Sequence, residues 1–215
     1  MSAAREEIVA RIRAAIGDSC RSDPVVEYAS VVRTYQRTPR FDRDERLRLF
    51  ASRLADYDCG VGTCDSASVA DTVAGVLARR GRRRLVAPPG FPAVWAPPDL
   101  DLTHDHALSA LEIERFEGVI TSCAVAIAFT GTILLTHSDA EGRRALTLLP
   151  DYHLCVVPED RVVDTLPEAL ARIRGDHGGL ITTISGPSAT ADIEMTRIRG
   201  VHGPRTLDVV IVAAP

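Results

Sequence analysis

The sequence has no run of 18 consecutive apolar residues, and its N-terminal segment has no apolar core followed by a cleavage site. The first absence argues against a helix that crosses a bilayer. The second absence, together with the glutamates Glu6 and Glu7, argues against a secretory signal. The sequence therefore predicts a cytoplasmic protein with no membrane span.

Aromatic residues make up only 5% of the sequence, and the formal net charge is small, at −4. A weakly acidic chain has no strong electrostatic attraction to nucleic acid or to an anionic membrane. The basic run at residues 79–84 has no interleaved aromatic side chains on which bases could stack. We interpret this run as a solvated helix end, where cations complement the helix dipole, and we expect no nucleic-acid partner.

The sequence lacks the spacings that build a cofactor site. Its five cysteines are scattered without a C-x-x-C motif, whereas structural zinc and iron–sulfur clusters need closely spaced thiolates. There is no Walker G-K-[ST] and no G-x-G-x-x-G. His104 and His106, near Asp101, lie among prolines and aspartates, which indicates an exposed polar loop. We expect reduced thiols, no metal and no cofactor in this chain.

The chain of 215 residues has a globular composition, with 46% hydrophobic and 25% charged residues. An amphipathic helix occupies the N-terminal segment and ends near Gly17, and residues 18–41 have no clear period. We divide the chain into an N-terminal helical arm with its connector, residues 1–41, and a domain at 42–215. Two interpretations of the arm remain open: it docks on a neighbouring protein, or it packs on its own domain.

Short apolar strands alternate with amphipathic helices after residue 42. This order predicts an α/β domain with an open, mainly parallel or mixed sheet and flanking helices. The helices are expected from Asp42, from Ser66 to Arg80, around residues 108–116, and from Pro167. The strands are expected at residues 61–64, 84–89, 118–123, 133–135, 145–150, 152–157, 180–185 and 207–214.

The stretch SGPSATADIE (185–194) follows an expected strand and combines small hydroxyls, a turn and two carboxylates. A short helix beginning at 188–190 would place free N–H groups where an anion could bind. Asp192 and Glu194 are two residues apart, so on a helix they diverge and are secondary acid–base candidates. The ligand-binding candidates of this stretch are Ser185, Gly186, Pro187, Ser188 and Thr190.

Two further patterns are candidate site residues. Thr130, Gly131 and Thr132 open an apolar strand and either contact a ligand carbonyl or phosphate, or form a tight turn. Asp151 and His153 are expected on one side of a strand. They form either a pair that orients the imidazole for proton transfer or an unremarkable histidine at a sheet edge.

SGPSATADIE followed by GVHGPRTLDVVIV (200–212) resembles the C-terminal signature of the LUD-domain family, in its lactate-utilisation protein C (LutC/YkgG-like) branch. The segments GVITSCAVAIAFTGTILL and RRALTLLPDYHLCVV agree in order. The resemblance implies a NagB/RpiA/CoA-transferase-like fold. It also implies a role in oxidising L-lactate to pyruvate with two iron–sulfur partner proteins, this chain being the cluster-free member. It adds His202, as a catalytic candidate, and Gly203 to the expected cleft.

Two positions depart from the family pattern. Phe129 stands where an acid is common, and Ala189 stands where arginine or lysine is frequent. Both departures remove charge from the expected cleft, so we expect a subunit that binds a small carboxylate or other anion without holding the redox centre. Whether this chain is an enzyme stays open. The alternatives are a stand-alone enzyme of CoA-transferase-like or cyclo-ligase-like fold, and a non-catalytic regulator or scaffold.

Overall fold

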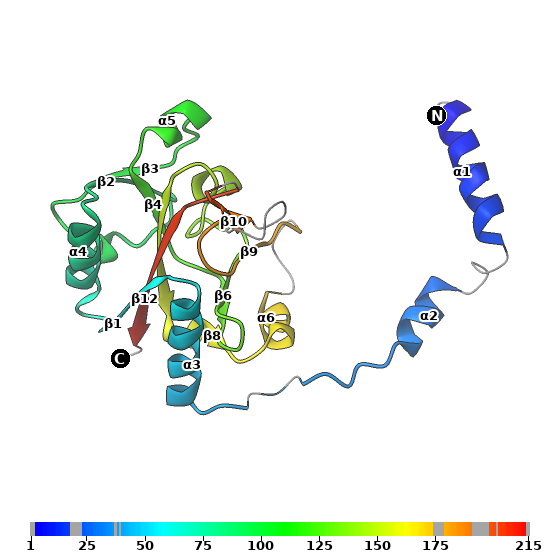
Figure 1. Ribbon diagram of the computed structural model, residues 1–215, viewed down its shortest axis with the longest axis horizontal. Helices are drawn as coiled ribbons and strands as arrows, with labels where there is room; N and C mark the ends of the chain where they lie inside the picture. Colours follow the sequence, from blue (N-terminus) through cyan, green and yellow to red (C-terminus); the bar gives the residue numbers. More distant parts are fainter. Residues whose placement is uncertain are drawn as a thin grey trace. The chain divides into compact units, whose positions relative to one another are not determined.

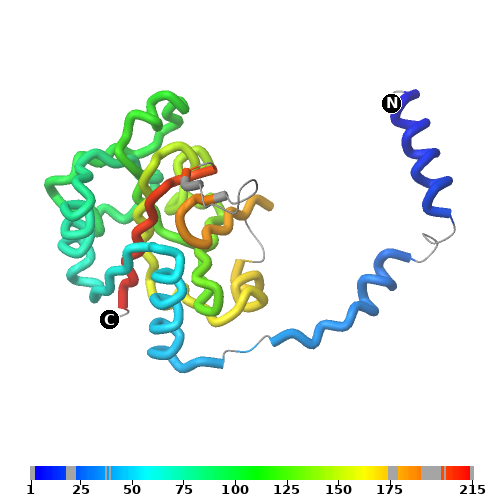
Figure 2. Tube along the Cα trace, viewed as in Figure 1, coloured from blue at the N-terminus to red at the C-terminus, as the bar shows by residue number. Residues whose placement is uncertain are grey.

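The computed structural model describes residues 3–17, 23–36, 38, 40–173, 179–190, 198–200 and 202–213. The chain divides into two compact units, Met1–Tyr35 and Gln36–Pro215 (Figures 1 and 2). The N-terminal unit contains the expected helix, α1 (Ala3–Ile16), and a second helix, α2 (Pro24–Ser30). The sequence analysis missed α2, although Asp23 caps it by accepting from the Val25 amide at 2.9 Å.

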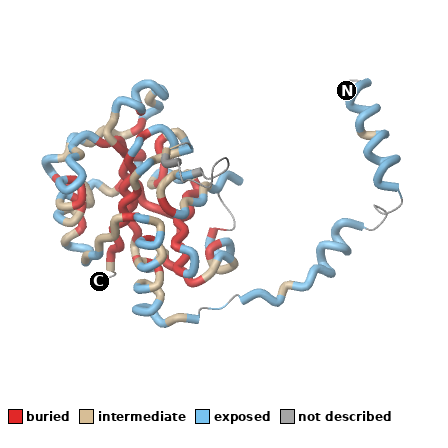
Figure 3. Tube along the Cα trace, viewed as in Figure 1, coloured by how far each residue is buried: buried red, intermediate tan, exposed pale blue. Residues whose placement is uncertain are grey.

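The centre of the C-terminal unit is a six-stranded sheet, sheet A, in which every pairing is parallel. Nearly all residues of its inner strands are buried, as expected for a parallel sheet that is covered on both faces (Figure 3). This architecture confirms the predicted α/β class. In spatial order the strands are β1 (Gly60–Asp65), β12 (Thr206–Ala213), β7 (Tyr152–Pro158), β4 (Gly118–Thr121), β2 (Arg84–Ala87) and β3 (Asp101–His104).

Successive side chains of β7 enter two different hydrophobic cores. Cys155 and Val157 pack in the core that contains Phe50 and Leu54 of α3 (Arg43–Asp56). Leu154 and Val156 pack in the core that contains Val73 and Leu77 of α4 (Val69–Arg80). Because side chains of a strand alternate between its faces, α3 and α4 cover opposite faces of sheet A.

The helix ends follow the sequence signals closely. Asp42 and Glu45 form the predicted capping box of α3. Gly81 ends α4 in the left-handed conformation, with φ of 63°. The start of α4 differs from the prediction, since its N-cap is Ser68 and not Ser66. The remaining helices are α5 (Ala110–Glu114) and α6 (Leu166–Arg172), with the 3-10 turns η2 (Ala93–Trp95), η3 (Arg144–Thr147) and η4 (Glu159–Arg161).

A smaller mixed sheet, sheet B, has four strands. Its order is β8 (Val162–Val163), β5 (Val125–Ile127), β6 (Thr132–Leu135) and β9 (Thr182–Ile184). Strand β6 is antiparallel to both of its neighbours, whereas β5 and β8 are parallel. Beyond it, β10 (Ala189–Thr190) and β11 (Ile198–Arg199) pair as an antiparallel hairpin.

Residues 145–150 were predicted as a strand, and this prediction is wrong. The segment begins as η3, and only part of it is apolar and inward. Leu146 packs against Val86 and Ile113, whereas Leu148 and Leu149 are exposed. Two adjacent exposed leucines do not fit the two-residue alternation of a half-buried strand, so tertiary packing decides the conformation here.

The segment around His104 was predicted as an exposed loop, and it is instead ordered against the sheet. Strand β3 ends at His104, and the carboxylate of Asp105 is buried. Arg143 binds both oxygens of Asp105 at 2.7 and 3.0 Å, which holds the pKa of that carboxyl below its usual value. The pairing explains how an aspartate can be buried at this position.

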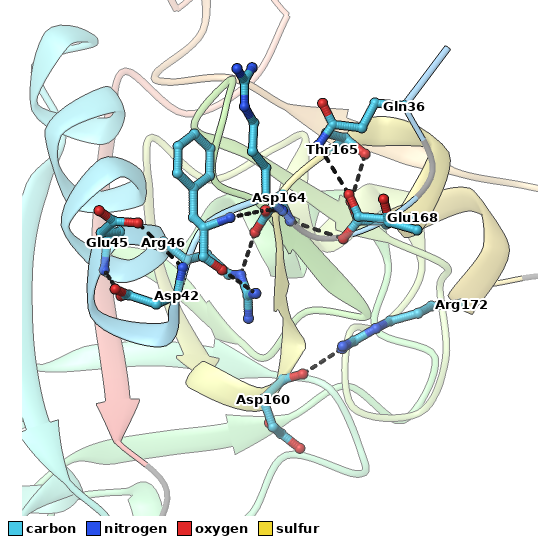
Figure 4. Close-up of polar contacts among 12 residues, drawn as sticks. Gln36, Asp42, Glu45, Arg46, Asp160, Asp164, Thr165, Glu168 and Arg172 are labelled. Atoms are coloured by element: carbon cyan, nitrogen blue, oxygen red, sulfur yellow. Dashed lines mark hydrogen bonds and ion pairs between the residues drawn. The ribbon is translucent and has the colours of Figure 1, made fainter. Parts of the chain in front are cut away.

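The segment that leads into α3 is fixed by the buried carboxylate of Asp164 (Figure 4). Asp164 accepts hydrogen bonds from the backbone amides of Arg40 and Phe41 and from the side chain of Arg46. We call these four residues the Asp164 clamp. Because Asp164 follows β8, the clamp joins the start of this unit to sheet B.

Candidate functional site

A pocket of about 230 Å³ lies where η3, the starts of β7 and β12, and the segment after β9 meet. It is at the amino ends of these two sheet A strands, whereas ligands in open parallel sheets usually bind at the carboxyl ends. Of the strands that meet at the pocket, only β9 of sheet B reaches it with its carboxyl end. The pocket is lined by Arg144, Thr147, His153, Thr182, Thr183, Ile184, Ser185, Gly186, Pro187, Ser188, Ala189, His202, Gly203, Pro204 and Leu207.

Most of the predicted binding segment lines this pocket. Ser185, Gly186, Pro187 and Ser188 form one wall, and His202 and Gly203 lie on the same pocket although they are distant in sequence. Asp192 and Glu194 lie outside the described residues, as does the side chain of Thr190. The structure thus brings together the two motifs on which the family resemblance rests.

Ser188 organises this wall through three hydrogen bonds. Its amide donates to the Pro204 carbonyl at 2.8 Å, and its carbonyl accepts from the Gly200 amide at 2.9 Å. Its hydroxyl accepts from the His202 amide at 3.0 Å. The helix that we considered at 188–190 is not formed, because Ala189 begins β10. The hypothesis of an anion site on a helix N-terminus is therefore wrong here.

Thr130, Gly131 and Thr132 lie beside the pocket wall. The hydroxyls of Thr130 and Thr132 are 2.7 Å apart, and that of Thr132 is 2.8 Å from the hydroxyl of Ser185. Gly131 has φ of 62°, and a Cβ at this position would lie 2.7 Å from Cβ of Arg53. The tight-turn interpretation thus accounts for the glycine, while the hydroxyls link the turn to Ser185.

Arg144 supplies the cation of the pocket. Its guanidinium contacts the Thr147 hydroxyl at 3.2 Å and the His202 carbonyl at 3.5 Å. Among the described residues it has no carboxylate partner, and partial burial lowers its pKa from the usual value. An arginine remains charged despite such a shift, so its charge is available to an anionic ligand.

The sequence analysis did not identify Arg144. This residue directly precedes the segment 145–150 that was assigned to a strand, and only the structure shows that η3 lies at the pocket. The signal was the arginine pair 143–144 before an otherwise apolar run. Ala189, which lacks the cation frequent in the family, also lines the pocket. Phe129 is 57% exposed, and its carbonyl accepts from the Arg53 side chain at 3.3 Å.

His153 lies on β7 and is 1% exposed. Its Nε2 is 2.8 Å from the Thr121 hydroxyl. Burial, and then the nearby charge of Arg144, lower the pKa of His153 to about 4, so the ring is neutral near pH 7. A neutral imidazole in a pocket is a hydrogen-bonding group that can also exchange a proton.

The predicted pairing of His153 with Asp151 is wrong. Asp151 precedes β7, is exposed, and lies 3.6 Å from the Arg205 side chain. The alternative of a histidine at a sheet edge is also wrong, because β7 lies between β12 and β4. The partner of His153 is Thr121. Its hydroxyl is neutral, so it does not offset the lowering of the His153 pKa by burial.

The described cysteines do not form a metal site. Cys59, Cys64, Cys123 and Cys155 are free thiols, and Cys20 lies outside the described residues. Within the ranges that the structure covers, no three histidine, cysteine or acidic side chains cluster as metal ligands would. Over the same ranges no helix is long and apolar enough to cross a bilayer.

Comparison with known proteins identifies the family. Residues 110–212 match the family model described as LUD domain. A protein of Deinococcus radiodurans named lactate utilization protein C is 42% identical over 173 residues, which cover 79% of this chain and 81% of that protein. The chain belongs to the LUD-domain family. The matched range of the LUD domain contains every residue that lines the pocket.

Other LUD-domain relatives agree. A lactate utilization protein C from an Exiguobacterium species is 29% identical over 179 residues, covering 78% of this chain and 76% of that protein. A 1.70 Å crystal structure of a DUF162 family protein from D. radiodurans superimposes with a TM-score of 0.69 at 38% identity. That comparison covers 80% of this chain and 99% of the other, and it supports the α/β fold described above.

Proposed function

We propose that this LUD-domain protein takes part in lactate utilisation as a cluster-free cytoplasmic subunit in the oxidation of L-lactate to pyruvate. The names of the relatives from D. radiodurans and Exiguobacterium support the lactate-utilisation role. The family resemblance implies two iron–sulfur partner proteins that carry the electrons, and this sequence itself contains no cluster motif. The pocket binds the small carboxylate on which the system acts.

The observation that carries this proposal is the guanidinium of Arg144 in the pocket, without a carboxylate partner in the described part of the chain. A guanidinium can donate two parallel hydrogen bonds to one carboxylate. The other polar side chains that line the pocket are hydroxyls and the imidazoles of His153 and His202, so no carboxylate among the lining residues competes with an acid for this cation. The volume of about 230 Å³ suits a ligand smaller than the drug-sized molecules that occupy roughly 300–1,000 Å³.

Replacing Arg144 with glutamine is expected to weaken L-lactate binding by roughly 10- to 100-fold. Hydrogen bonds to charged groups contribute about 1.5–3 kcal/mol, which corresponds to that range. Isothermal titration calorimetry with the whole protein measures the dissociation constant. Arg144→Lys keeps the charge but loses the planar fork, and should give an intermediate value.

The matched control is Arg48→Gln, which alters an exposed arginine of α3 that does not line the pocket. It should leave the dissociation constant unchanged. Equal affinity of Arg144→Gln and the unaltered protein for L-lactate would contradict the assignment of Arg144 as the carboxylate anchor.

The partner assignment has a separate test. Affinity purification of the tagged protein from cells grown on lactate should recover two proteins that contain iron–sulfur clusters, detectable by visible absorption and by mass spectrometry. Deletion of the gene should slow growth on L-lactate but not on a sugar. Recovery of no such partner, together with normal growth of the deletion strain on lactate, would exclude the proposed role.

A further inference from the structure

We infer that the pocket distinguishes 2-hydroxy acids from 2-oxo acids, and that Thr121, which lies behind His153, sets this preference. The inference rests on the proposed function, because it assumes that a small acid places its carboxylate at Arg144. The geometry of His153, Thr121 and Cys155 then determines which group next to the carboxylate is accepted.

His153 offers one ring nitrogen to a ligand. Its Nε2 is engaged by the Thr121 hydroxyl at 2.8 Å, and the ring lines the pocket although the side chain is almost fully buried. Among the described residues, the hydrogen bond of the His153 ring is made at Nε2, which leaves Nδ1 for a ligand. A ring nitrogen at a pocket that forms no hydrogen bond within the protein is available to a polar group of a ligand.

A row of hydrogen bonds behind the ring favours the tautomer with the proton on Nε2. The Cys155 thiol donates to the Ser122 carbonyl at 3.7 Å, and its sulfur retains lone pairs that can accept a hydrogen bond. The Thr121 hydroxyl donates to this sulfur at 4.0 Å. Because a hydroxyl has one proton, the Thr121 oxygen then accepts from Nε2–H of His153. In this arrangement Nδ1 carries a lone pair.

An acceptor beside a carboxylate anchor matches a 2-hydroxy acid. The hydroxyl of L-lactate can donate to Nδ1 while its carboxylate accepts from Arg144. The keto oxygen of pyruvate is an acceptor only. It would face the lone pair of Nδ1, which is also an acceptor, and neither atom would form a hydrogen bond. A site built to bond a substrate hydroxyl discriminates strongly against an analogue that cannot donate, because the buried polar group of the site is then unpaired. We expect L-lactate to bind at least tenfold more tightly than pyruvate.

The test compares Thr121→Val with Thr121→Ser in the whole protein. Valine matches threonine in shape but removes the hydroxyl, whereas serine restores it. Calorimetric titrations with L-lactate and with pyruvate should show the preference in the unaltered protein and in Thr121→Ser, and lose most of it in Thr121→Val. Long-range proton–nitrogen NMR should show the Nε2-protonated pattern for His153 in the unaltered protein, with the signal assigned by its absence in His153→Gln.

Three outcomes overturn the inference. The first is equal or tighter binding of pyruvate with Arg144-dependent affinity, which leaves the proposed function intact. The second is an Nδ1-protonated His153 in the unaltered protein, which needs no variant and is therefore independent of whether Thr121→Val folds. The third is a preference unchanged in folded Thr121→Val. If neither acid binds at all, the proposed carboxylate pocket fails together with the inference.

Discussion

Replacing Asp164 with alanine is expected to lower the free energy of unfolding by about 3–5 kcal/mol, the usual effect of breaking a buried ion pair. Asp164 is 0% exposed, and its carboxylate accepts hydrogen bonds from the side chain of Arg46 and from the amides of Arg40 and Phe41. Burial alone would raise the pKa of Asp164, but these hydrogen bonds hold it below the usual value. Alanine leaves the three donors without an acceptor. Urea unfolding followed by circular dichroism measures the change.

Asp160→Ala is the matched control for this prediction. Asp160 is an exposed aspartate of η4, and the hydrogen bond that it accepts from Arg172 goes to its backbone carbonyl, which alanine retains (Figure 4). The control should change stability by less than about 0.5 kcal/mol. A loss below 1 kcal/mol in Asp164→Ala would show that the Asp164 clamp does not hold the segment before α3.

Lowering the pH from 6.5 to 4 is expected to cost about 3 kcal/mol of stability through His153 alone. The folded-state pKa is about 4, and the unfolded value is about 6.5. Between these values the unfolded chain binds a proton that the folded protein does not, so stability falls as the pH falls. Above the unfolded pKa both states are neutral and the effect is absent. Each pH unit between the two values contributes about 1.4 kcal/mol.

His153→Gln isolates this contribution, because glutamine does not titrate and its amide nitrogen can replace Nε2 next to Thr121. Other groups titrate equally in both proteins and cancel. The stability difference between the unaltered protein and the variant should be constant above pH 7 and should move by about 3 kcal/mol in favour of the variant by pH 4. A difference that is independent of pH would show that His153 is not buried as a neutral ring.

The elements whose signals lie within their own stretch of sequence were predictable. The inner strands of a parallel sheet are apolar throughout, and the runs around residues 118–123 and 152–157 identified β4 and β7. The box of Asp42 with Glu45 was equally clear, because a cap involves only neighbouring residues. The segment 145–150 failed because its conformation depends on packing against α5 and β2, which are distant in sequence.

The site was predictable only in part, for the same reason. The hydroxyl-rich turn at 185–188 and His153 were identified from residue type and spacing, and they line the pocket. Arg144 and Thr121 were not, since an arginine pair before an apolar run and a threonine in a strand do not by themselves indicate a site. Their roles arise from contacts across the fold, with His202 and His153 respectively. The roles assigned to Asp192 and Glu194 stay predictions.

The position of β12 has a consequence for how a new chain acquires this fold. Strand β12 is the last strand described, yet it lies between β1, the first, and β7. Until it is synthesised, β7 presents an unpaired edge, and an unpaired edge is a template for association with other chains. Pairings between such distant segments also form slowly. Newly made molecules therefore pass through an aggregation-prone interval, in which a chaperone that covers β7 would raise the yield of folded protein.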